Sequence, residues 1–102
     1  MERTFNGQTV TVDPEGYLSD FSQWSRDIGE TLAAEAGVPL TPRHWEVLTY
    51  LQSEYRNAVP LSIRRIGKSG VTDIKEFYQL FPTAPLKTAA KIAGIPKPVS
   101  CL

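Results

Sequence analysis

Residues 41–57 read TPRHWEVLTYLQSEYRN, and this stretch carries the local signals of one amphipathic helix. Thr41 is a favoured N-cap residue, and Pro42 stands at the first helical position, where its missing N–H removes no hydrogen bond. Apolar side chains then recur at spacings of three and four residues, which places them on one face of the helix. They are Trp45, Leu48, Leu51 and Tyr55. The helix is expected to end near Asn57, before Pro60.

On the N-terminal side of this helix, residues 3–12 are expected to form a short β-hairpin. The reason is Asn6-Gly7, a strong two-residue turn signal between β-prone residues. A first helix is expected over residues 22–36, because an apolar side chain recurs there at every fourth position. These side chains are Trp24, Ile28 and Leu32. Gly37 fits the C′ position that ends a helix.

On the C-terminal side, the sequence predicts three further and shorter helices. The first spans residues 61–66, and the second is capped by Thr72 and ends before Pro82. The third is capped by Thr83 and runs through Ala93. The fold class predicted from this pattern is mainly α, a small helical bundle with an N-terminal β-hairpin and an extended C-terminal arm.

The arm is predicted from the last nine residues, GIPKPVSCL. Pro96 and Pro98 stiffen it, because they exclude a helix and remove backbone donors from any strand. Gly94 suits both a helix stop and a hinge. At about 3.1 Å per residue, the arm would carry Cys101, the only cysteine, roughly 20 Å from Gly94. The chain is thus expected to be one domain, 1–102, with a hairpin and turn (1–16), a helical body (17–93) and a flexible C-terminal arm (94–102).

The charge balance, 11 basic and 11 acidic residues, argues against a domain that coats nucleic acid or an anionic membrane. One cysteine excludes an internal disulfide, and one cysteine with one histidine is too few for a zinc site, so no metal is expected. That histidine, His44, is expected to be a packing or capping residue. The sequence shows no signal peptide and no membrane-spanning stretch, so a cytoplasmic protein is expected.

A specific pattern covers the C-terminal third of the chain. It consists of Leu80-Phe81-Pro82, Pro85, Lys87, the block KIAGIPKP at residues 91–98, and the penultimate Cys101. Further matches lie upstream at Asn6-Gly7, Asp13, Glu15-Gly16-Tyr17-Leu18, Trp24, Leu40-Thr41 and His44-Trp45. With these residues the chain resembles the DsrC/TusE family of sulfur-relay proteins over nearly its whole length.

The resemblance implies a carrier without a cofactor. Sulfane sulfur would be held as a persulfide on Cys101, received from upstream sulfur-donor carrier proteins and passed to a downstream acceptor enzyme. Such a protein is a sulfurtransferase-type carrier rather than a self-contained enzyme. In the TusE branch, the sulfur moves toward 2-thiolation of the wobble uridine of certain tRNAs.

In the DsrC branch of the family, two cysteines work together with dissimilatory sulfite reductase. The second of them lies eleven residues before the penultimate one, a position that Ala90 occupies in this chain. A single thiol can carry a persulfide but cannot close an intramolecular disulfide. The TusE-like role is therefore favoured, and a sulfite reductase or heterodisulfide-reductase-like complex is the alternative partner.

The proposed chemistry requires that the thiol of Cys101 be ionised, because the thiolate is the form that attacks a donor's sulfur. The adjacent terminal carboxylate disfavours the anion. Lys97, Lys91 or Arg64 would stabilise it if the arm folds back on the body. Lys97 is otherwise either a solvated charge or a contact for an acidic groove of a partner.

The region from residue 60 to residue 80 leaves a second class of function open. Its segment 67–77 is shorter than in typical family members, and the spacing from Pro60 to Arg64 is one residue longer. Basic residues flank a stretch that resembles a helix–turn–helix, namely Arg64, Arg65, Lys68 and Lys75. Asp73 and the zero net charge argue against DNA binding, which stays the alternative of another class.

Overall fold

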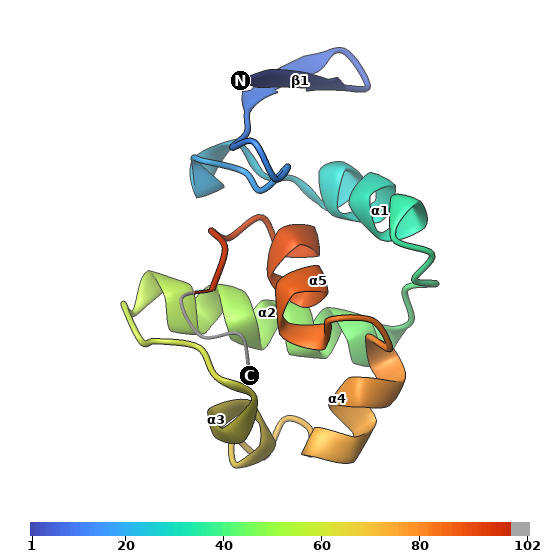
Figure 1. Cartoon of the computed structure of the whole chain (residues 1–102), viewed down its shortest axis with the longest axis vertical. Coiled ribbons are helices and arrows are strands. Elements are labelled where there is room, and N and C mark those ends of the chain that lie inside the picture. The colour runs from blue at the N-terminus through green and yellow to red at the C-terminus, as the bar shows by residue number, and fades with distance from the viewer. Residues whose placement is uncertain (99–102) are drawn as a thin grey trace.

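The structure is a computed structural model that describes residues 1–98; residues 99–102, with Cys101 among them, lie outside the described residues. Its strands are β1 (Glu2–Phe5) and β2 (Gln8–Thr11). Its helices are the 3-10 turn η1 (Phe21–Gln23), α1 (Arg26–Glu35), α2 (Pro42–Arg56), α3 (Ile63–Gly67), α4 (Ile74–Leu80) and α5 (Pro85–Ile92). The hairpin lies at one end of the molecule, α5 lies in the middle beside α2, and α3 and α4 form the other end (Figure 1).

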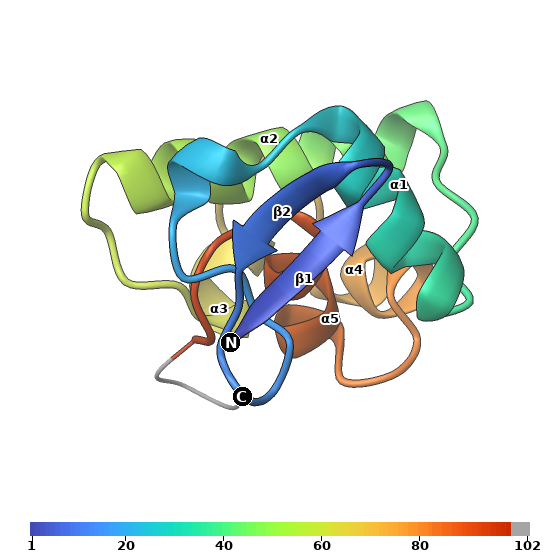
Figure 2. The ribbon, with the colours of Figure 1, turned by 90° about the horizontal axis from the view of Figure 1, so that it is seen from above.

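The hairpin forms as its turn signal predicts. β1 and β2 pair antiparallel, and Phe5 lies opposite Gln8. Asn6 and Gly7 between them adopt φ angles of 47° and 86°, the positive values that a two-residue hairpin turn requires. The hairpin lies beside α1 (Figure 2), where Arg3 forms an ion pair with Glu35.

The first predicted helix begins later than the sequence suggested. Residues 21–23 form the separate turn η1, capped by the side chain of Asp20, and α1 starts only at Arg26 with Ser25 as its N-cap. Two capping side chains five residues apart divide the segment, because each accepts a backbone N–H and fixes its own helix start. Trp24 lies between them in extended conformation, with φ of −70° and ψ of 144°.

α2 has the start and end that its sequence predicts. Thr41 accepts a hydrogen bond from the backbone N–H of His44, the side chain of His44 reaches back to the Thr41 backbone, and Asn57 is the C-cap. This capping box confirms that His44 is a capping residue. The other ring nitrogen, Nε2, lies 2.8 Å from the carbonyl oxygen of Leu80 and so joins the start of α2 to the end of α4.

Two of the predicted caps near the C-terminal helices are wrong. α4 is capped by Asp73, whose Oδ1 accepts the N–H of Glu76 at 2.7 Å, while the hydroxyl of Thr72 donates to the Glu76 carboxylate instead. At the start of α5, Ala84 has a left-handed φ of 44° and no side chain caps the helix. The first short helix begins at Ile63, after its N-cap Ser62, rather than at residue 61.

α5 supplies the centre of the hydrophobic core and packs against α1, α2 and α4. Its alanines, Ala89 and Ala90, are completely buried, and Leu86 and Ile92 are nearly so. Small side chains let the neighbouring helices approach closely, and this puts the C-terminal end of α5 deep in the molecule. None of the helices formed by residues 1–98 is long and apolar enough to cross a membrane.

Candidate functional site

The residues that follow α5 lie against the helical body. We call residues 94–98 the arm root, because the predicted arm begins with them. Gly94, Ile95 and Pro98 are buried, whereas Pro96 and Lys97 are exposed. Ile95 is only 1% exposed and belongs to the core. Cys101, the predicted carrier of the chemistry, lies three residues beyond the described part of the chain.

Hydrogen bonds from side chains and from the backbone hold the chain where α5 passes into the arm root. Trp24 Nε1 donates to the carbonyl oxygen of Ile92 at 2.8 Å, and Gln52 Nε2 donates to that of Ala93 at 2.9 Å. The N–H of Ile95 donates to the carbonyl oxygen of Ala90 at 3.2 Å. The last carbonyls of a helix have no partner within the helix, so side chains from two other elements satisfy them here. The direction in which the chain leaves α5 is thereby set.

Trp24 also packs tightly on two glycines. A Cβ atom on Gly94 would lie 2.2 Å from Cδ1 of the indole, and one on Gly29 would lie 3.0 Å from its Cζ2. Gly94 in addition has a φ of +77°, in the left-handed region that favours glycine. The indole therefore lies between α1 and the arm root, and both contacts depend on the absence of a side chain.

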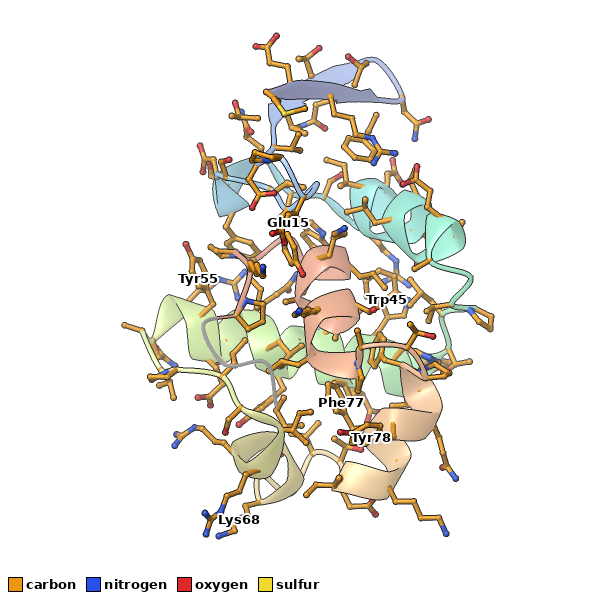
Figure 3. All side chains as sticks on the ribbon, viewed as in Figure 1. Glu15, Trp45, Tyr55, Lys68, Phe77 and Tyr78 are labelled. Carbon is orange, nitrogen blue, oxygen red and sulfur yellow. The ribbon has the colours of Figure 1, made fainter. Side chains whose placement is uncertain are left out.

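Two lysines near the arm root face the turn formed by residues 13–17. Lys97 Nζ lies 2.9 Å from Oε1 of Glu15, and Lys91 Nζ lies 5.0 Å from the ring centroid of Tyr17. Figure 3 shows Glu15 at the C-terminal end of α5. Asp13 Oδ1 holds the turn by accepting the N–H groups of Glu15 and Tyr17 at 2.9 and 3.0 Å. Because Lys97 and Glu15 are both well exposed, their ion pair is weak and readily opened.

The residues predicted to stabilise a thiolate are thus divided between two places. Lys91 and Lys97 lie at the same turn, whereas Arg64 lines a hollow between α2 and α3. The roles predicted for Cys101 and for the arm residues Gly94, Pro96, Lys97 and Pro98 stay predictions. Within residues 1–98, no group of three or more His, Cys, Asp or Glu side chains could hold a metal ion.

Two of the residues that hold the arm root are not predicted from the sequence. The sequence places Trp24 in the apolar repeat of the first predicted helix, and it gives Gln52 no role. A polar residue on the apolar face of α2, one position after the fully buried Leu51, signals a buried hydrogen-bond partner. Gly29 inside a helix is a second signal, because glycine there is unfavourable unless packing requires it.

The strongest pKa shifts among the described residues belong to an ion pair that joins α2 to the start of α4. Arg43 donates to both carboxylate oxygens of Glu76, at 3.0 Å through Nε, and to the carbonyl oxygen of Val71 at 2.8 Å. The hydrogen bonds from Arg43, and then that from Thr72, lower the pKa of Glu76 to about 2. This ion pair joins α2 to α4, and it lies outside the arm root.

Glu76→Gln is expected to remove a pH-dependent part of the stability. Since the folded-state pKa of Glu76 is depressed from 4.5 to about 2, its contribution is complete above pH 4.5 and is lost as the pH falls toward 2. Urea unfolding should therefore show the variant less stable at neutral pH and equal to the original protein near pH 2. The control is Glu46→Gln, at an exposed partner of the same Arg43. A constant difference across the acid range would contradict the assignment.

Comparison with known proteins gives matches that span almost the whole chain. Residues 4–102 match the family described as DsrC like protein. The protein named Sulfurtransferase TusE from Escherichia coli (strain K12) is 39% identical over 107 residues, which cover 96% of this chain and 97% of that protein. The protein of the same name from Pectobacterium atrosepticum is also 39% identical with the same coverage.

Two solved structures share the fold over the full length of both chains. The NMR structure of Allochromatium vinosum DsrC has a TM-score of 0.83 and 31% identity, and it covers 100% of each chain. The crystal structure of dissimilatory sulfite reductase I (DsrI) has a TM-score of 0.86 and 31% identity with the same coverage. The predicted mainly helical fold with an N-terminal hairpin is confirmed.

Proposed function

The chain belongs to the DsrC/TusE family of sulfur-relay proteins, and within it we propose that this protein carries sulfane sulfur on Cys101. The observation that carries the proposal is the full-length family match, which extends to residue 102 and includes the only cysteine of the chain. The matched relatives named Sulfurtransferase TusE support a transfer role over a purely structural one. The protein partners of such a relay are a donor carrier and an acceptor enzyme.

The transfer proceeds by thiolate exchange in two balanced steps. The Cys101 thiolate attacks the outer sulfur of a donor persulfide, the donor's S–S bond breaks, and the donor leaves as a thiolate. Cys101 then bears the persulfide, and an acceptor thiolate attacks its outer sulfur and releases the Cys101 thiolate. One sulfur atom moves in each step, and no external oxidant or reductant is consumed.

The described geometry suits such a role because the start of the arm is held in a fixed position on the helical body. Hydrogen bonds from Trp24 and Gln52 fix the direction of the chain at residues 92–93. At about 3.3 Å per residue, a fully extended chain from Pro98 to Cys101 would reach at most roughly 10 Å, enough for the thiol to enter the active site of a partner. The weak pair of Lys97 and Glu15 is one contact that would open if the end of the root moves.

The favoured destination of the sulfur is the 2-thiolation of tRNA wobble uridine, in the cytoplasm. The alternative destination is a sulfite reductase or another sulfur-oxidation complex, and Ala90 disfavours it. A second thiol at residue 90 would be needed for an intramolecular disulfide, and this position holds a completely buried alanine of α5. A helix–turn–helix DNA-binding role is the alternative of another class.

The carrier role is tested by loading. The protein is incubated with a polysulfide or a persulfidated sulfurtransferase as donor, and its intact mass is measured before and after a thiol reductant is added. We expect the mass of one additional sulfur atom, lost on reduction and mapped to the C-terminal peptide. A chain that gains no sulfur from either donor would overturn the proposal.

A further inference from the structure

The hollow between α2 and α3 is lined by a concentration of positive charge, of which only Arg64 is a candidate for stabilising the Cys101 thiolate. It has a volume of about 590 Å³ and is formed by Tyr50, Glu54, Ser62, Arg64, Arg65, Lys68 and Ser69. Three of these residues are cationic and only one is anionic, in a chain whose formal net charge is zero. We call this set of residues the α2–α3 hollow.

The cations of the α2–α3 hollow are incompletely paired. Arg65 Nε lies 3.4 Å from Oε2 of Glu54, whose side chain is only 16% exposed. Within residues 1–98, neither Arg64 nor Lys68 forms an ion pair, although both side chains are exposed. Figure 3 shows Lys68 projecting from the end of the molecule that α3 occupies. Two cations are thus available to an external anion at one concave place.

The helix dipole explains only part of this charge. Arg64 and Arg65 lie in the last turn of α3, where a cation is favoured, but a helix of five residues has a small dipole and Lys68 lies beyond its last residue. Of the hydroxyl groups in the hollow, that of Ser69 is already engaged, since it donates to the carbonyl oxygen of Ile66 at 2.6 Å. The guanidinium group of Arg64 matches the two oxygens of a carboxylate, and the ammonium group of Lys68 adds a second positive charge in the same hollow.

We propose that the α2–α3 hollow docks an acidic segment of a partner protein, with Arg64 and Lys68 as the contacts to its carboxylates. The identification of that partner as a sulfur-relay protein rests on the proposed function. The location fits this role, because the ribbon of residues 94–98 ends on the same side of the molecule as α3 (Figures 1 and 2). A partner held at the hollow would then lie beside the arm that carries the thiol.

The surroundings of the hollow favour an acidic protein segment over nucleic acid. A helix–turn–helix reader would present the N-terminus of α4 to the DNA, and this end carries Asp73 and Glu76. Asp73 caps the helix, and Glu76 is paired with Arg43. If either carboxylate turned away from a DNA phosphate, the helix cap or the ion pair would be lost. A duplex also needs a broad basic surface, whereas these cations surround a confined hollow that contains Glu54.

The proposal is tested with a fluorescein-labelled hexaglutamate peptide, titrated with the full-length protein and followed by anisotropy. We expect saturable binding that weakens with added salt and that falls about tenfold or more in the double variant Arg64→Glu with Lys68→Glu. The matched control, Lys75→Glu with Lys87→Glu, makes the same change of charge outside the hollow and should bind within about twofold of the original protein.

Three results would overturn the proposal. They are no binding of the peptide, equal losses of affinity in both double variants, and tighter binding of labelled duplex DNA that depends on Arg64 and Lys68.

Sulfur loading of Cys101 from polysulfide separates this proposal from the carrier function, because loading from polysulfide needs no docked protein. Loading that stays normal in the single variant Lys68→Glu, at a residue with no predicted role at the thiolate, while its peptide binding is weakened, supports docking. Loading that fails in every form contradicts the carrier function alone.

Discussion

Gly94→Ala is expected to destabilise the protein by about 3 kcal/mol, as measured by urea unfolding. About 1 kcal/mol of this comes from placing a side chain at the left-handed φ of +77°. The rest comes from overpacking, because the new methyl group would lie 2.2 Å from Cδ1 of Trp24. Relief of that contact requires the indole to move, and this breaks its hydrogen bond to the carbonyl oxygen of Ile92.

Gly37→Ala is the matched control for this prediction. Gly37 also follows a helix and has a φ of +74°, but a Cβ atom there would meet nothing within 4 Å. Its replacement should therefore cost only about 1 kcal/mol, from the backbone conformation alone. The fluorescence of Trp24 should change in the Gly94 variant and stay constant in the Gly37 variant. Equal losses of stability in the two variants would mean that Gly94 acts only as a helix stop.

The elements that the sequence predicted best are those whose ends are specified by adjacent residues. α2 begins and ends as expected because Thr41, Pro42 and Asn57 each act within one turn of the helix they delimit. The hairpin follows from Asn6-Gly7 for the same reason, since both residues readily adopt positive φ. In these places the local conformational preference and the tertiary structure agree.

The start of α4 is misplaced because two neighbouring side chains could each serve as its cap. Thr72 and Asp73 are both good N-cap residues, and the choice falls to Asp73 because the hydroxyl of Thr72 is engaged with Glu76, itself held by Arg43 from α2. At the start of α5, Pro85 disfavours the right-handed helical conformation at Ala84, but it does not select the left-handed one that Ala84 adopts.

The candidate site shows the same division between local and distant information. The prolines and the terminal cysteine predicted an arm without any knowledge of the fold. The contacts at the base of the arm join residues that are far apart in the sequence. Trp24 and Ile92 are separated by 68 positions, and Gln52 and Ala93 by 41 positions, so no local pattern could reveal these contacts. Gly29 and Gln52 were nevertheless visible anomalies, one a glycine within a helix and the other a polar residue on an apolar face.

Cys101→Ser is expected to abolish sulfur loading and to leave the stability unchanged. The variant replaces the only thiol of the chain with a hydroxyl, which forms no persulfide under these conditions. The core, the arm root and all the hydrogen bonds described above lie within residues 1–98. Intact mass after incubation with a persulfidated sulfurtransferase should show no added sulfur, and urea unfolding should match the original protein. Sulfur that persists on the variant would assign the chemistry to another residue.

A thiol moved by one residue tests whether its position on the arm matters as well as its presence. Cys101→Ser combined with Ser100→Cys keeps one thiol on the arm but places it one residue closer to the root. A small donor such as polysulfide reaches either thiol, so loading from polysulfide should be nearly unchanged. A protein donor must align its persulfide with the thiol in a fixed geometry, and a misplacement of this size should slow transfer about tenfold or more. Equal rates from the protein donor would show that the arm does not position the thiol, and that the fixed root serves stability rather than transfer.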